Sequence, residues 1–121
     1  MGWGNQLWEV GINNHLSDQF QEFVVISGKY WHPYQMRNAR LILVEDDAFT
    51  RATLGDALIL QGFDVKARVA TAAEALAAQV EHAPQVAVLD LDLGIGPTGI
   101  DVAIALRSKN PQIGIVFLTT Y

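Results

Sequence analysis

The chain of 121 residues contains no cysteine, so it has neither a disulfide framework nor a thiolate metal site. Basic residues are scarce, with eight lysines and arginines against thirteen aspartates and glutamates, and the formal net charge is −5. A surface that binds nucleic acid through its phosphates is therefore not expected. No apolar run approaches the ~20 residues that span a bilayer, and the N-terminal residues lack the pattern of a signal peptide. These absences favour a cytoplasmic protein without membrane contact.

Half of the residues are hydrophobic and 17% are charged, which is typical of one small packed domain. The character of the chain changes near residue 38. Residues 1–38 contain all three tryptophans and show no regular periodicity except in the apolar run 23–26. We expect residues 1–38 to be a poorly structured N-terminal extension and residues 39–121 to be the domain itself, for which Met36 would be a natural start.

From Arg40 onward, short apolar runs alternate with alanine-rich helical patterns, which predicts a parallel α/β sheet. The predicted strands are residues 41–44, 63–69, 86–89 and 113–118, and the predicted helices are 48–61, 71–81 and 99–109. The second strand alternates apolar and polar residues, as expected at a sheet edge.

The predicted helices carry recognisable start and stop residues. Asp47 is placed to cap the first helix, and Gly62 is placed to end it in a left-handed conformation. Thr71 and Glu74 have the spacing of a capping box at the start of the second helix. Asp101 falls in the first turn of the third helix, where the helix dipole favours an acid.

Polar residues follow three of the predicted strands at the point where each strand ends: Glu45 and Asp46, then Asp90, then Thr119. The carboxyl ends of parallel strands meet at one edge of a sheet, where ligands bind. Carboxylates that share a small volume repel one another unless a cation lies among them or one stays protonated. Oxygen ligands favour a hard cation, and Mg²⁺ would complete its shell with phosphate oxygens. The pattern predicts attack by a carboxylate on phosphorus.

Four segments in order resemble the receiver domains of two-component response regulators: residues 41–47, residues 88–93, Gly99 and residues 117–119. The resemblance implies a flavodoxin-like, doubly wound parallel sheet. It also implies that Asp90 accepts the phosphoryl group and that Glu45, Asp46, Asp90 and the backbone carbonyl of Asp92 hold Mg²⁺. Thr119 is similar to the hydroxyl residue that hydrogen-bonds the phosphoryl group.

The same resemblance implies a place in phosphorelay signalling. The partner would be a sensor histidine kinase or a phosphotransfer protein. A receiver assists its own phosphorylation and dephosphorylation, so it is not a turnover enzyme. We therefore expect a magnesium-dependent phosphoprotein and no direct binding of nucleic acid by this chain.

The chain departs from the family pattern in three places. Gly94 stands where proline is usual, with one extra residue before Gly99, and Thr120 stands where a small residue is usual. The family's next helix, its fifth strand with a lysine, and its final helix are not in the sequence, which predicts a sheet truncated after the fourth strand.

A sheet that ends at residues 113–118 would leave an apolar edge strand unpaired, so we expect marginal stability or self-association through that edge. One hypothesis is that residues 23–26 supply the missing strand and that Lys29 replaces the family lysine. The other is that the sequence is a fragment of a longer regulator.

Two further functions stay open at this point. The chain could be a degenerate receiver that acts only through protein contacts, as the missing lysine suggests. It could also be a phosphatase similar to haloacid dehalogenases, because Asp90-Leu91-Asp92 resembles their paired aspartates. That family's additional acids follow this motif, whereas Glu45 and Asp46 precede it, which argues against the second alternative.

Overall fold

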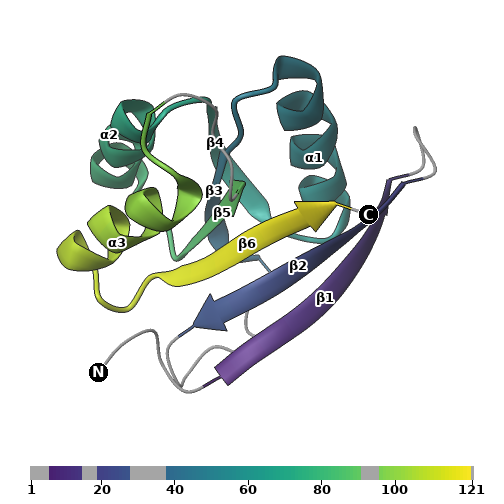
Figure 1. Ribbon diagram of the computed structural model, residues 1–121, viewed down its shortest axis with the longest axis horizontal. Coiled ribbons are helices and arrows are strands. Elements are labelled where there is room, and N and C mark those ends of the chain that lie inside the picture. The colour runs from purple at the N-terminus through teal and green to yellow at the C-terminus, as the bar shows by residue number, and fades with distance from the viewer. Residues whose placement is uncertain (1–5, 15–18, 28–37, 91–95, 121) are drawn as a thin grey trace.

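The computed structural model describes the backbone of residues 6–14, 19–27, 38–90 and 96–120, and side chains within 38–90 and 96–117 (Figure 1). Six strands form one sheet in the order β1-β2-β6-β5-β3-β4. The strands are β1 (Gln6–Asn14), β2 (Gln19–Ser27), β3 (Arg40–Val44), β4 (Asp64–Val69), β5 (Val86–Asp90) and β6 (Gly114–Thr120). The helices are α1 (Ala48–Leu60), α2 (Ala72–His82) and α3 (Gly99–Lys109).

Strands β3 to β6 are parallel and are joined by the three helices. Their order in space is β4-β3-β5-β6, so the chain starts in the middle of this parallel unit, moves to one side and then returns past its starting strand. This is the flavodoxin-like arrangement, in which the reversal of strand order opens a crevice at the carboxyl ends of the first and third strands. Those strands are β3 and β5, and the predicted fold class is confirmed.

The helices cover both faces of the parallel strands and create two hydrophobic clusters (Figure 1). On one face, Leu54 and Leu58 of α1 are buried against alternate residues of β3, β5 and β6. On the other face, α2 and α3 contribute Ala75, Val102 and Leu106. Strands β3 and β5 are buried on both faces because each lies under helices on both sides, which is why their sequences are continuously apolar. Neither of these central strands can shift register without disturbing both clusters.

The predicted helix signals are confirmed. The Asp47 side chain accepts a hydrogen bond from the Thr50 amide at 2.8 Å, and Gly62 takes a positive φ of 101° just after the end of α1. The Thr71 hydroxyl accepts from the Glu74 amide at 3.2 Å. Thr98 and Asp101 form a reciprocal capping box at the start of α3. These caps satisfy amides that have no partner inside the helix.

The segment before the parallel unit differs from the sequence-based expectation. Residues 6–14 and 19–27 form an antiparallel pair of nine-residue strands, β1 and β2, where an irregular extension was predicted. The other residues of 1–37 lie outside the described part of the chain. The correction has a physical reason: β2 pairs with β6, and that pairing joins segments about ninety residues apart, which no local pattern can reveal. The division into domains at residues 38 and 39 stays a prediction.

Strand β6 is not at an edge of the sheet, because β2 pairs with it antiparallel from Gln21↔Thr120 to Ile26↔Ile115. The expected open edge is therefore wrong for the described chain. The hypothesis that residues 23–26 supply a neighbouring strand is confirmed, with the strand antiparallel and longer than expected. Lys29 lies outside the described residues, so its proposed role is untested.

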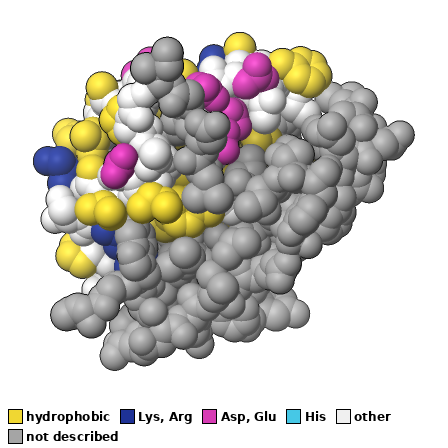
Figure 2. Space-filling view, in the orientation of Figure 1, with side chains coloured by type: hydrophobic (Ala, Val, Ile, Leu, Met, Phe, Trp, Pro, Cys, Tyr) yellow, Lys and Arg dark blue, Asp and Glu magenta, His cyan; other side chains and the backbone are white. Residues whose placement is uncertain are grey.

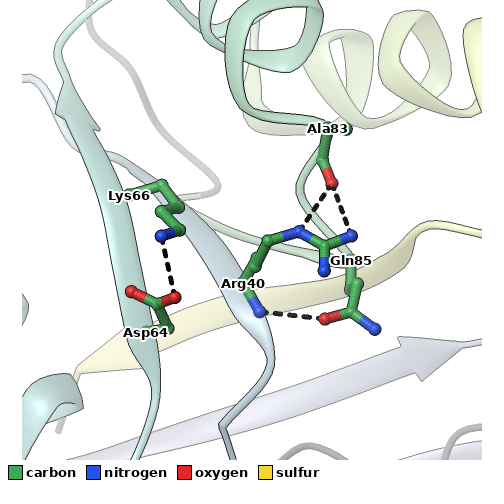
Figure 3. A network of polar contacts seen from close by, with 5 residues as sticks. All are labelled: Arg40, Asp64, Lys66, Ala83 and Gln85. Atoms are coloured by element: carbon green, nitrogen blue, oxygen red, sulfur yellow. Dashed lines mark hydrogen bonds and ion pairs between the residues drawn. The ribbon is translucent and has the colours of Figure 1, made fainter.

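Polar contacts hold the sheet together at the end where β3 and β5 begin, opposite the carboxyl ends of these strands (Figure 3). The Arg40 guanidinium donates to the carbonyl of Ala83 through Nε at 3.2 Å and Nη2 at 3.1 Å. Ala83 is the left-handed C-cap of α2. The Arg40 amide also donates to Oε1 of Gln85 at 3.1 Å. Arg40 therefore ties the end of α2 to the start of β3.

Candidate acidic metal site

Three carboxyl groups meet at the carboxyl ends of β3 and β5. Glu45, Asp46 and Asp90 each offer one carboxylate oxygen, and these oxygens lie within 4.8 Å of one another. Figure 2 shows acidic side chains gathered on one part of the surface. The structure thus brings together three of the side chains that the sequence singled out, while their roles as ligands stay predictions.

The strands position these groups because β3 and β5 are paired neighbours, with Val44 opposite Leu89. Glu45 follows Val44 directly, and its amide still donates to the Val69 carbonyl of β4 at 2.9 Å. Asp90 is the last residue of β5. The three acids differ in exposure: Glu45 is buried, Asp90 is half-buried and Asp46 is exposed. The site is therefore open on the side of Asp46.

Burial raises the pKa of the Glu45 carboxyl from 4.5 to about 8. Its environment removes water, which disfavours the charged form, and the neighbouring carboxyl groups of Asp46 and Asp90 raise the pKa further. A hydrogen bond from the Asp47 amide to Glu45 Oε2, at 3.2 Å, acts in the opposite direction. Without a cation, the cluster holds a proton on Glu45 at neutral pH.

The stability of the metal-free protein is expected to fall as the pH rises from 4.5 to about 8, the ordinary and the folded pKa of Glu45. The folded state binds this proton more tightly than the unfolded state, so the stabilisation is complete below 4.5 and is lost as the pH passes through the folded value. One such group changes the free energy of unfolding by at most ~1.4 kcal/mol per pH unit. Urea unfolding in the presence of a chelator measures this slope.

Glu45→Gln is the matched variant for this measurement, because it keeps a hydrogen-bonding side chain of the same size that does not titrate. It should flatten the slope over the same pH range. Asp47 and Glu74 do not interfere, since hydrogen bonds at their helix caps lower the pKa of each carboxyl and move its effect to more acidic pH. If the free energy of unfolding has the same pH dependence in the two proteins, Glu45 is not the group that binds the proton in the folded state.

The donor set fits a hard divalent cation. All three side chains offer oxygen, and Mg²⁺ is commonly bound by one or two carboxylates together with water and phosphate oxygens. A cation would also favour the charged form of each ligand, against the burial and the neighbouring carboxyl groups that raise the pKa of Glu45.

The other two predicted site residues are placed only in part. Thr119 lies in β6, one residue beyond Leu118, which is opposite Asp90 in the pairing of β5 with β6. Its backbone is therefore at the same end of the sheet, next to the strand that carries Asp90. Asp92 lies outside the described residues, and so does Gly94 in the loop that departs from the family pattern.

Sequence reasoning missed Arg51, a half-buried residue of α1 beside the acids. Its Nη1 atom donates to the backbone carbonyl of Glu45 at 2.9 Å and reaches the carbonyl of Asp46 at 3.4 Å. The available signal was its place one helical turn after Asp47, in the helix that follows the acidic pair. That spacing lets a long side chain fold back over the preceding turn.

An acidic cluster at the carboxyl ends of the central strands of a flavodoxin-like sheet is the architecture of a receiver domain. Residues 41–121 match the family model described as the response regulator receiver domain. The chain therefore belongs to the family of receiver domains of two-component response regulators. This assignment favours the receiver interpretation over the phosphatase alternative.

The chain is similar to two curated proteins that illustrate this relationship. It is 34% identical over 80 residues to the transcriptional regulatory protein PrrA of Mycobacterium tuberculosis, covering 66% of this chain and 34% of PrrA. It is 33% identical over 54 residues to the chemotaxis protein CheY of Bacillus subtilis, covering 45% of each chain. The chain thus spans about a third of the length of PrrA.

Solved structures show the same fold. The response regulator PhyR of Brucella abortus has a TM-score of 0.61 and 26% identity, over 68% of this chain and 34% of PhyR. A two-component response regulator of the LuxR family from Aurantimonas sp. has a TM-score of 0.55 and 34% identity, over 61% of this chain and 53% of that chain. None of the described helices combines the length and apolar character needed to cross a membrane.

Proposed function

We propose that this domain accepts a phosphoryl group on Asp90 and does so with Mg²⁺ held by Glu45, Asp46, Asp90 and the backbone carbonyl of Asp92. The observation that carries the proposal is the convergence of three carboxylate oxygens within 4.8 Å at the ends of two neighbouring parallel strands. Burial, with a smaller contribution from the neighbouring carboxyl groups, raises the pKa of Glu45, and a bound cation would favour the charged form of all three acids.

In this mechanism, an Asp90 carboxylate oxygen attacks the phosphorus atom of a phosphorylated donor. A new P–O bond forms as the bond to the donor's leaving group breaks, which gives an acyl phosphate on Asp90 and releases the dephosphorylated donor. Asp90 suits this role because it is half-buried at a strand end, reachable from solvent and held by the β5 backbone. When bound, Mg²⁺ supplies charge neutralisation for the phosphoryl oxygens.

The remaining residues have supporting roles. Glu45 and Asp46 come from the same turn and together supply negative charge on the side of the crevice opposite β6. Thr119 is the residue proposed to donate a hydroxyl hydrogen bond to the phosphoryl group, because its backbone lies next to Asp90 at the end of β6. A hydroxyl donor to a phosphoryl oxygen is a charge-assisted bond of above-average strength.

The donor partner is proposed to be a sensor histidine kinase or a phosphotransfer protein of a cytoplasmic phosphorelay. The domain stores one phosphoryl group and releases it by hydrolysis, so it is a signalling switch and not a turnover enzyme. Receiver-family membership supports this role.

Incubation with acetyl phosphate and Mg²⁺ tests the proposal. Intact-protein mass spectrometry should show the gain of one phosphoryl group, and a chelator should prevent that gain. The same sample without acetyl phosphate is the control for mass changes caused by the metal. Absence of phosphorylation in a folded sample that binds Mg²⁺ would favour a degenerate receiver that acts through protein contacts alone, and steady release of phosphate from esters would favour the phosphatase alternative.

A further inference from the structure

We infer that Arg51 is a positioning residue of the acidic site: it holds the turn between β3 and α1 so that the carboxyl groups of Glu45 and Asp46 face Asp90. The inference rests on the proposed metal site and adds a residue that binds neither metal nor phosphoryl group. Arg51 is positively charged and lies next to the acids that would bind a cation, although a guanidinium at that place repels a cation. A role other than charge would account for its position.

The contacts of Arg51 are with the backbone of the turn. Nη1 donates to the Glu45 carbonyl at 2.9 Å, a bond of good length, and makes a longer contact of 3.4 Å with the Asp46 carbonyl. One donor atom therefore touches both peptide groups that carry the paired acids. The Arg51 amide also donates to the Asp47 carbonyl at 2.8 Å in the first turn of α1. That bond belongs to the helix and would remain in Arg51→Ala, so the contribution of the side chain is its contacts with the Glu45 and Asp46 carbonyls.

Other bonds hold the two ends of the turn: at the start of α1, the Asp47 carboxylate accepts from the Thr50 amide at 2.8 Å. The Glu45 amide is bound to Val69 at 2.9 Å, and the Asp47 amide reaches Glu45 Oε2 at a longer 3.2 Å. Asp46 lies between them and is exposed. Its side chain hydrogen-bonds that of Glu45, so the direction of the pair depends on the backbone that carries both acids. A group that fixes a ligand's backbone from outside the ligand shell supports metal affinity in the way that outer hydrogen bonds do.

The charge of Arg51 also acts on two exposed acids. Its positive charge lowers the pKa of the Asp47 and Glu74 carboxyl groups, in addition to their cap hydrogen bonds. The contacts of the guanidinium itself are with the β3–α1 turn. This placement explains how a cation can lie beside the site without pairing directly with its ligands: its hydrogen bonds go to carbonyl oxygens.

Titration with Mg²⁺ alone, at a fixed pH above the pKa of Glu45, separates positioning from simple charge. If Arg51 positions the turn, Arg51→Ala weakens Mg²⁺ binding about tenfold or more, in the range seen when outer-shell partners of metal ligands are removed. If Arg51 acts only as a nearby charge, its removal strengthens Mg²⁺ binding, because a repelling cation is lost. Affinity that rises or stays unchanged would overturn the inference.

Two variants make the comparison specific. Arg51→Lys keeps the charge and one ammonium donor, so it should recover part of the affinity lost in Arg51→Ala. Arg68→Ala is the matched control, because Arg68 binds the Ala52 carbonyl at 3.0 Å and Asp56 at 3.0 Å on the same helix without contacting the β3–α1 turn. It should leave Mg²⁺ affinity unchanged even where it lowers stability.

A second measurement needs no metal. In Arg51→Ala, the Asp47 amide should exchange with solvent faster by NMR, while the Glu45 amide, bound within the sheet to Val69, keeps its rate. If the parent protein binds no Mg²⁺, the metal site of the proposed function fails, yet the exchange rates still decide the role of Arg51. An unchanged Asp47 rate would contradict the inference.

Discussion

Asp90→Asn is expected to take up no phosphoryl group from acetyl phosphate and Mg²⁺ under conditions in which the parent protein is labelled. The amide has no anionic oxygen to attack phosphorus, so the loss should be complete and not partial. Intact-protein mass spectrometry over a time course measures it. The variant should fold, because it removes one of three crowded carboxylates and lowers their mutual repulsion.

Asp64→Asn is the control for this experiment. Asp64 is an exposed carboxyl at the start of β4, paired with Lys66 at 2.9 Å on the opposite end of the sheet (Figure 3). An exposed ion pair of this kind contributes about 0–1 kcal/mol to stability, so the variant should be labelled like the parent protein. Labelling of Asp90→Asn at the parental rate would place the phosphoryl group on another residue and refute the assignment.

Removal of residues 1–35, leaving a chain that begins at Met36, is expected to cause self-association. The deletion removes β2. The backbone groups of β6 that face β2 then have no partner along six residues, from Ile115 to Thr120, while the pairing of β6 with β5 remains. An open apolar edge strand pairs readily with another chain, and Ile115, Val116 and Phe117 are buried in the parent structure. Light scattering after size exclusion, over a range of protein concentrations, measures the mass.

The same deletion should lower stability. One cross-strand pair contributes ~0.2–1 kcal/mol, so six pairs correspond to roughly 1–6 kcal/mol. The matched control removes only residues 1–5 and keeps both strands of the hairpin. It should behave like the full chain. If the longer deletion stays monomeric with an unchanged unfolding midpoint, the hairpin does not protect β6.

The acidic site illustrates how far local reasoning reaches. The strand ends at Glu45 and Asp90 could be read directly from apolar runs that stop at an acid. Their proximity followed from one general property of parallel sheets. The strength of the interaction could not be predicted, because the raised pKa of Glu45 depends on its burial under surrounding elements and on the directions of neighbouring carboxyl groups.

Arg51 shows a different limit. Its place one helical turn after Asp47 allows the side chain to fold back onto the preceding turn but does not require it, because a side chain at the same position can also point to solvent. Its contacts with two carbonyl groups depend on the angle at which α1 leaves β3. That angle is fixed by the packing of Leu54 and Leu58 against the sheet.

The sequence by itself determined the parallel unit, its helix ends and the identity of its acids. Helix caps such as Asp47 with Thr50 join residues three positions apart, so they can be predicted from a short stretch of sequence. Strands buried on both faces can be predicted from continuous apolar runs. Only the tertiary structure decided that residues 19–27 lie beside β6, since strand pairing over a long separation depends on the whole sheet being assembled. Hydrogen bonds between residues close in sequence can be predicted from the sequence. Strand pairing between distant segments, and the burial that it causes, form only when the whole sheet is assembled.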